Sequence, residues 1–124
     1  MILDAGFLIS VDRSEEAARQ FLAAADRQGI ELRTTHPVVG QVWRDGVRQA
    51  RLASFLKGLE LFSLDDGRLV GRLLAASGTS DVVDAHLITV ALRTGDAVLT
   101  GDVGDLARLA APLGPSAPVI HPWP

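Results

Sequence analysis

The chain has 124 residues, 48% of them hydrophobic, which fits one compact domain over residues 1–124 that buries most of its unfolded surface. A net charge of −3 excludes a protein that coats nucleic acid through bulk electrostatics, so any nucleic-acid contact must be local. The absence of cysteine excludes a disulfide framework, thiolate zinc ligands and a cysteine nucleophile, and it suits a reducing compartment.

The sequence carries no sign of membrane insertion or export. No apolar run approaches the roughly 20 residues needed to cross a bilayer. The chain opens on MILDAG, without the basic segment and cleavage site of a signal peptide. We therefore expect a cytoplasmic protein without a membrane partner.

Short apolar runs and helical patterns alternate along the chain. In order, they predict a strand at 2–5, a helix over 14–28, a strand at 31–35, helices over 36–44 and 47–57, a strand at 60–64, helices over 65–77 and 81–93, a strand at 97–100, a helix over 103–110 and a strand at 117–121. Ser14, Asp65 and Ser80 are residue types that begin helices, and we expect them to be N-caps. Glycines are expected to end helices at positions 29, 78 and 95.

This alternation predicts an α/β fold with a mainly parallel sheet and helices on both faces, because a parallel crossover usually contains a helix. In such folds, ligands bind at the carboxyl ends of the strands, where the strand order reverses. Asp4 ends the first predicted strand, and Asp102 and Asp105 follow the fourth. Asp84 lies near the start of the helix over 81–93. We expect these four carboxylates to converge on one rim of the sheet.

Crowded carboxylates suggest a cation. Asp81 and Asp84 are three residues apart on a helix and lie on nearly the same face. Like charges raise one another's pKa and are tolerated when a cation or a shared proton compensates. Oxygen ligands, without cysteine and without a His-x-x-x-His pair, favour Mg²⁺ or Mn²⁺ over zinc. Such an ion suits phosphodiester hydrolysis, where metals activate water and stabilise the leaving oxygen.

Each acidic residue also has a structural explanation. Asp81 would stabilise a helix N-terminus through the macrodipole, and Asp105 could begin the last helix. Asp4 and Asp102 favour a functional interpretation, because an acidic group at the end of an apolar strand costs stability unless something pairs with it.

Three segments together resemble the PIN-domain ribonucleases, particularly the VapC-like toxins of bacterial toxin–antitoxin pairs. They are LDAG at 3–6, SDVVDAHLITVAL at 80–92 and VLTGDVGDL at 98–106. Their order and spacing and the length of the chain are similar to the family over nearly the whole sequence.

The resemblance implies a three-layer α/β/α PIN-like fold and metal-dependent cleavage of RNA. The catalytic residues that it implies are Asp4, Asp84, Asp102 and Asp105. The first three would hold Mg²⁺ or Mn²⁺, with Thr100 beside them. The resemblance also implies a cognate antitoxin and a homodimer. An apolar helix over 47–56 could provide the dimer surface, although apolar helices equally well cover a sheet.

Gln41 departs from the family pattern, which places a glutamate in the helix after the second strand. A neutral amide cannot act as an anionic ligand or a base. It could still bind a metal-bound water or orient an aspartate, supporting the site from outside. It could equally be a polar position on a helix.

Three arginines near Gln41 offer a local basic surface. Arg44, Arg48 and Arg51 recur at intervals of four and three, and they form a stripe if the helices on either side of Gly46 run continuously. A solvated face is the simple explanation. The functional explanation is that these arginines contact RNA phosphates beside the acidic site.

The histidines and tryptophans favour structural roles. His36, His86 and His121 show no ligand spacing. Trp43 and Trp123 are expected to be packing or interface residues rather than platforms for base stacking.

The alternative function is a degenerate domain of the same fold that binds RNA or protein without cutting it. Gln41 supports this alternative, and the retained Asp4, Asp84 and Asp102 argue against it. Other enzyme classes fit poorly, because the sequence has no Gly-x-Ser-x-Gly elbow, phosphate-binding Gly-Lys-Ser/Thr loop or Gly-x-Gly-x-x-Gly turn.

Overall fold

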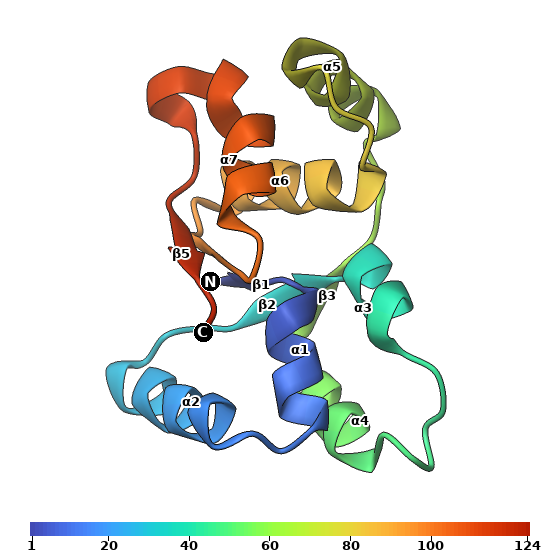
Figure 1. The fold of residues 1–124 in the computed structure, drawn as a ribbon, viewed down its shortest axis with the longest axis vertical. Coiled ribbons are helices and arrows are strands. Elements are labelled where there is room, and N and C mark those ends of the chain that lie inside the picture. Colours follow the sequence, from blue (N-terminus) through green and yellow to red (C-terminus); the bar gives the residue numbers. More distant parts are fainter.

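Figure 1 shows the computed structural model, which describes all 124 residues. The strands are β1 (Ile2–Leu3), β2 (Arg33–Thr35), β3 (Glu60–Phe62), β4 (Val98–Thr100) and β5 (Ile120–Pro122). The helices are α1 (Ala5–Asp12), α2 (Glu16–Gln28), α3 (His36–Val42), α4 (Ala50–Lys57), α5 (Gly67–Ser77), α6 (Val82–Thr94), α7 (Val103–Ala110) and the 3-10 helix η1 (Ala111–Ser116). None of the helices combines the length and apolar character that crossing a bilayer requires.

All five strands are parallel, in the order β3-β2-β1-β4-β5. In the central strand β1, Ile2 pairs with Arg33 on one side and with Val98 on the other. The chain builds outward from β1 to β3, then returns to place β4 on the opposite side of β1. The strand order therefore reverses between β1 and β4, and the carboxyl ends of these two strands border the crevice where such folds bind ligands.

Helices cover both faces of the sheet, which confirms the predicted α/β/α layers. In Figure 1, α5, α6 and α7 lie on one side of the strands, and α1, α2 and α4 lie on the other. On the first side α6 contacts β1 and β2 directly, and α5 and α7 pack against it. On the second side α1 contacts β4 and all of α2, α3 and α4.

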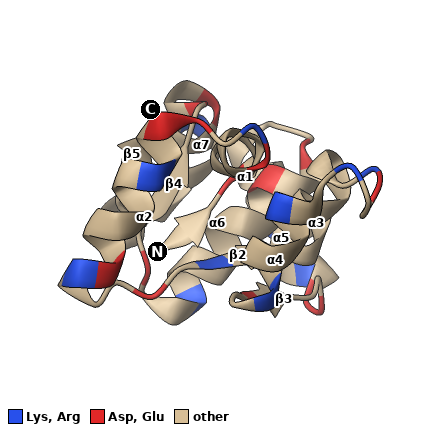
Figure 2. Ribbon diagram, turned by 90° about the horizontal axis from the view of Figure 1, so that it is seen from below, with Lys and Arg blue, Asp and Glu red and all other residues tan.

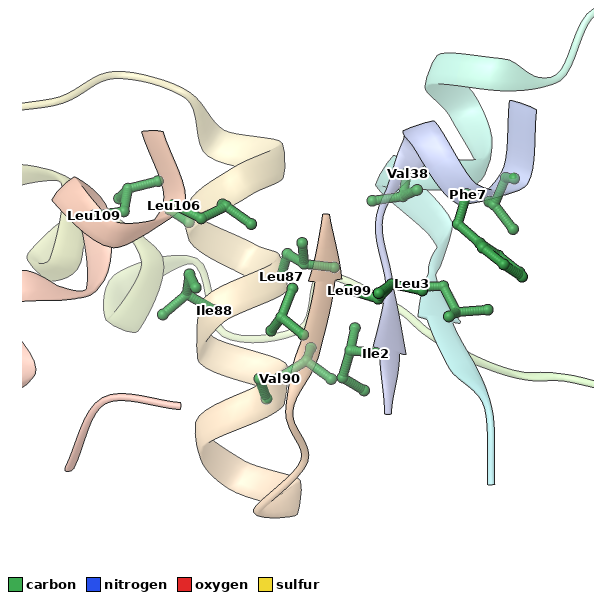
Figure 3. Packing of buried hydrophobic residues seen from close by; sticks show 14 of the residues in the cluster. Ile2, Leu3, Phe7, Val38, Leu87, Ile88, Val90, Leu99, Leu106 and Leu109 are labelled. Carbon is green, nitrogen blue, oxygen red and sulfur yellow. The ribbon is translucent and has the colours of Figure 1, made fainter. Parts of the chain in front are cut away.

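The core lies on both faces of β1. An unbroken run of buried residues occupies the middle of α6. Figure 3 shows Val90 of α6 facing the sheet beside Ile2, while Leu3, Phe7 and Val38 lie on the opposite side of β1. Each of these side chains is fully buried. Burial of a side chain of this size stabilises the fold by roughly 1.5 to 3 kcal/mol, so the two strands that carry the crevice are firmly anchored.

Helix α1 is the main difference from the predicted elements, which place no helix before residue 14. Its sequence AGFLISVD is apolar on the exposed side as well, where Ile9 lies, so it lacks the polar stripe that identifies a surface helix. Ser14 then adopts a left-handed backbone with φ of 55°, and α2 begins at Glu16. The prediction that Ser14 is an N-cap is therefore wrong.

Two further predicted N-caps are each wrong by one residue. Asp66, in place of Asp65, caps α5 by accepting a hydrogen bond of 3.1 Å from the backbone N–H three residues later. Asp81, in place of Ser80, caps α6 in the same way at 3.0 Å. Serine and aspartate both cap helices well, so residue type alone does not choose between neighbours. The predicted helix ends are confirmed by left-handed glycines at Gly29, Gly78 and Gly95.

The helix predicted over 47–57 begins only at Ala50, because residues 43–49 form a loop. Gln49 holds this loop: its side chain accepts hydrogen bonds from two backbone N–H groups and donates one of 2.8 Å to the Val42 carbonyl. The apolar side of α4 packs into the core, where Leu52 is fully buried. Within the chain this helix packs against α1, and a homodimer stays a prediction.

Candidate functional site

The site begins with Asp4, at the carboxyl end of β1. Its backbone is extended, so its carboxylate caps α1: Oδ1 accepts a hydrogen bond of 2.7 Å from the Ala5 N–H. Oδ2 accepts one of 2.7 Å from the Thr100 hydroxyl. The residue is only 8% exposed. These two partners offset the cost of placing a carboxylate at the end of a buried strand.

Asp102 follows the end of β4, the strand that pairs with β1. The Asp102 N–H donates a hydrogen bond of 2.9 Å to the Thr100 hydroxyl, and the Asp102 carboxylate caps α7 with a 3.4 Å hydrogen bond from the Asp105 N–H. Thr100 is fully buried. Its hydroxyl connects the two acidic residues, because it donates to the Asp4 carboxylate and accepts from the Asp102 N–H. The predicted role of Thr100 in supporting a metal site stays a prediction.

Asp84 lies on α6, one turn after the N-cap Asp81. Burial raises the pKa of Asp84 to about 7, and four further carboxylates raise it in the same direction. They belong, in decreasing order of effect, to Asp81, Asp4, Asp102 and Asp105. This repulsion shows that the five aspartates share one electrostatic environment, which we call the acid rim. The Asp84 carboxylate accepts no hydrogen bond from the protein, unlike those of Asp4, Asp81 and Asp102.

Asp105 is an exposed member of the acid rim, in the first turn of α7. Hydrogen bonding to the Asp102 carboxyl raises the pKa of Asp105, and like-charge repulsion from the same group adds to the effect. The structural roles considered for Asp81 and Asp105 are both present, since one caps a helix and the other lies in a first turn. Both residues still belong to the acid rim, because their carboxylates raise the pKa of Asp84.

An oxygen-liganded cation is compatible with the acid rim. No group of three His, Cys, Asp or Glu side chains lies in an arrangement that could hold a metal ion by itself. Mg²⁺, however, commonly uses one or two protein carboxylates together with water and substrate phosphate. Asp4 and Asp102 retain free lone pairs after capping their helices, and both oxygens of Asp84 are free of protein donors. The donors present are of the type that Mg²⁺ or Mn²⁺ binds, and the assignment of Asp4, Asp84 and Asp102 as ligands stays a prediction.

A surface hollow of about 270 Å³ opens beside the rim. Asp81, Asp84 and Asp105 line it together with Arg108, which sequence reasoning missed. Three larger hollows lie elsewhere: one beside the amino ends of β2 and β3, one between α2 and α4, and one between the end of α6 and residues 116–119. No rim aspartate lines any of them. The small hollow is therefore the one that belongs to the acidic chemistry.

The arginines expected beside the site do not form a stripe. Arg44 and Arg48 lie in the loop over 43–49, and only Arg51 is on α4. The Arg44 guanidinium donates to the Trp43 carbonyl at 2.6 Å, and Arg48 lies 3.8 Å from the Asp45 carboxylate. The prediction of a continuous basic face is therefore wrong. Figure 2 likewise shows basic and acidic segments dispersed over the ribbon.

Gln41 is exposed on α3, and no contact in the structure assigns it to the acid rim. Its proposed role in supporting the site stays a prediction. Arg51 lines the hollow between α2 and α4 rather than the hollow that contains Asp84.

His86 and Trp123 have structural surroundings, as expected. His86 is almost fully buried, its Nε2 lies 3.2 Å from the Ser63 carbonyl oxygen, and burial lowers its pKa. The Trp123 ring packs edge-on against Phe7, with centroids 4.8 Å apart, and its N–H donates to the Ser10 hydroxyl at 3.0 Å.

Comparisons with known proteins support the fold. No protein-family model and no curated protein matches the sequence. Among solved structures, the chain is similar to one in VapBC2 from Rickettsia felis, determined bound to a DNA fragment from its promoter. The TM-score is 0.68 at 14% sequence identity, and the match covers 99% of this chain and 98% of the other. The shared architecture over nearly both whole chains shows that this protein has a PIN-like α/β fold.

Proposed function

We propose that the protein is a metal-dependent endoribonuclease and the toxin of a toxin–antitoxin pair. The observation that carries the proposal is the environment of Asp84. Its side chain is half-buried and accepts no hydrogen bond from the protein, and burial and four nearby carboxylates raise its pKa to about 7. A fold gains nothing in stability from such an arrangement. A divalent cation would relieve it, which is the usual reason for keeping an acidic cluster of this kind.

The residues of the rim divide the work. Asp4, Asp84 and Asp102 would hold Mg²⁺ or Mn²⁺, which when bound lowers the pKa of an attacking water and stabilises the departing oxygen of a phosphodiester. The helix caps and the Thr100 hydroxyl fix the directions of Asp4 and Asp102 before any substrate arrives. Asp105, exposed beside Asp102, is free to accept a proton during the reaction. Preorganised ligands of this kind are what phosphoryl chemistry requires.

Two further observations support a partner protein. The similar solved chain comes from VapBC2, which was determined with promoter DNA. The present chain is acidic overall, and Figure 2 shows its Lys and Arg residues dispersed along the ribbon. We therefore propose a cognate antitoxin as the partner, a cytoplasmic location, and RNA as the substrate.

RNA cleavage by the purified protein, freed of any bound partner, tests this function. Single-stranded RNA should be cut in Mg²⁺ or Mn²⁺ and left intact after chelation. Asp4→Asn and Asp102→Asn should lose activity while staying folded, because asparagine keeps the oxygen that caps each helix. Asp26→Asn, an exposed change on α2, is the matched control and should cut as wild type does.

A non-catalytic binding module is the second candidate. The amide at Gln41 and the absence of a complete three-ligand group favour it. Binding of RNA or protein without RNA cleavage in Mg²⁺ or Mn²⁺ would distinguish this binding module from the nuclease.

A further inference from the structure

Arg108 is the one basic residue that lines the hollow beside the acid rim. It lies three residues after Asp105 on α7, so the two side chains share a face of the helix. Asp81 and Asp84 of α6 border the same hollow. A guanidinium is thus placed among three of the five rim carboxylates.

Arg108 nevertheless forms no ion pair. The ion pairs of the chain involve the N-terminal amine and four other arginines, namely Arg19, Arg33, Arg48 and Arg93. Arg108 and Asp105 line the same hollow, and the positive charge of Arg108 opposes the rise in the pKa of Asp105. The guanidinium therefore faces the hollow with all five of its N–H donors unshared by protein acceptors.

A simpler explanation exists, because Arg108 lies in the last turn of α7, where a cation stabilises the helix dipole. Arg27 occupies the same place on α2, is exposed, and forms no ion pair. It lines none of the hollows that contain a rim aspartate. Arg27 is therefore a matched reference for everything that Arg108 does as a helix-end cation.

We propose that Arg108 is a substrate-binding residue that contacts a phosphate of RNA next to the bond being cut. This inference rests on the proposed nuclease function and assigns part of its substrate site. An acidic rim repels a polyanion, so RNA needs a cation at the rim itself to bring its backbone close. Arginine suits this role, because its planar fork of donors matches two phosphate oxygens.

Binding of RNA, separated from cutting, tests the proposal. The probe is a fluorescently labelled single-stranded RNA oligonucleotide, titrated by anisotropy in Mn²⁺ in the Asp84→Asn background. Adding Arg108→Gln should weaken binding about tenfold, as the loss of one charged hydrogen-bond pair predicts. The slope of log K against log salt should also become shallower by about 0.7, the value for one phosphate contact on a single strand. Arg108→Lys should fall between Gln and the parent.

Adding Arg27→Gln in the same background should leave both affinity and salt slope unchanged. Equal effects of Arg108→Gln and Arg27→Gln would overturn the proposal and leave Arg108 as a helix-end cation. Cleavage by wild type decides the proposed function separately: if wild type cuts RNA and Arg108→Gln binds normally, only this inference fails. If no variant binds RNA and wild type does not cut, both fail.

Discussion

The Thr100 hydroxyl donates a 2.7 Å hydrogen bond to Oδ2 of Asp4, across 96 residues of sequence. The same hydroxyl oxygen accepts a hydrogen bond of 2.9 Å from the Asp102 N–H. One buried group thereby joins the ends of β1 and β4, the two strands between which the strand order reverses. The acid rim is consequently built on two neighbouring strands that this hydroxyl links.

Replacing this hydroxyl should destabilise the protein. Thr100→Val keeps the shape of the side chain but leaves Asp4 Oδ2 and the Asp102 N–H without their partner, and we expect unfolding free energy to fall by about 1 to 3 kcal/mol. Urea denaturation measures the change. Thr100→Ser retains the hydroxyl and should lose less, chiefly for its missing methyl group. Equal stabilities of the valine variant and wild type would show that the hydroxyl does not hold the rim.

Asp84→Asn should stabilise the protein in the absence of metal, in a manner that depends on pH. The pKa of Asp84 is about 7 in the folded protein against an ordinary value of 3.8, so between these values the folded state holds a proton that the unfolded state has lost. Unfolding free energy from this group is therefore highest at low pH and falls as pH rises to about 7. Asparagine does not ionise, so the Asp84→Asn variant should not lose unfolding free energy in this way as pH rises.

The expected size follows from the same pKa values. Full enclosure would correspond to about 4 kcal/mol, and partial access of solvent reduces the expected gain to about 1 to 2 kcal/mol. Melting temperatures in chelator should be about 4 to 8 °C higher for Asp84→Asn near neutral to alkaline pH and nearly equal to wild type near the ordinary carboxyl pKa. Asp26→Asn should show no such pH-dependent difference. A variant that melts lower than wild type under alkaline conditions would argue against a crowded Asp84.

Divalent metal should raise the melting temperature of wild type. A cation that binds only the folded rim stabilises it by about 2.7 kcal/mol when present at about a hundred times its Kd. Asp4→Asn should abolish the response to Mg²⁺ and Mn²⁺, and Asp26→Asn should preserve it. Absence of any response in wild type at millimolar metal would favour the binding module.

Gln41→Glu should lower the metal concentration needed for activity, because an anionic ligand or neighbour attracts the cation more strongly than an amide dipole. The measurement is the Mn²⁺ dependence of RNA cleavage for the variant and wild type. Identical metal curves would mean that α3 presents position 41 away from the cation, as a plain exposed helix residue.

Much of the fold could be predicted because the sheet leaves a regular trace in the sequence. Strands β1 and β4 are short apolar runs, a helix follows every strand except β5, and left-handed glycines end three of the helices. Helix α1 escaped prediction because FLISV is apolar on its exposed side as well as its buried side and carries no helical period. The predicted N-caps of α5 and α6 were wrong by one residue, because the neighbouring residue types cap helices equally well.

The candidate site divides in the same way. Asp4 and Asp102 could be predicted because strand ends in parallel sheets converge, wherever the chain goes between them. The arginine stripe failed because it required one continuous helix through Gly46, whereas Gln49 stabilises a loop there. Arg108 could have been found from its spacing of three from Asp105 on a predicted helix. Its freedom from ion pairs is a tertiary property that no local pattern carries.

The rate of RNA cleavage by Asp84→Asn, compared with wild type in Mn²⁺, tests the central claim most directly. The account predicts that wild type cuts RNA, that chelation stops it, and that the variant is slower by at least about a hundredfold. It also predicts that the slower variant has the higher melting temperature without metal, so that lost activity is not lost folding. Cleavage by Asp84→Asn at the wild-type rate, or no cleavage by wild type in either metal, would contradict the assignment of the acid rim as a nuclease site.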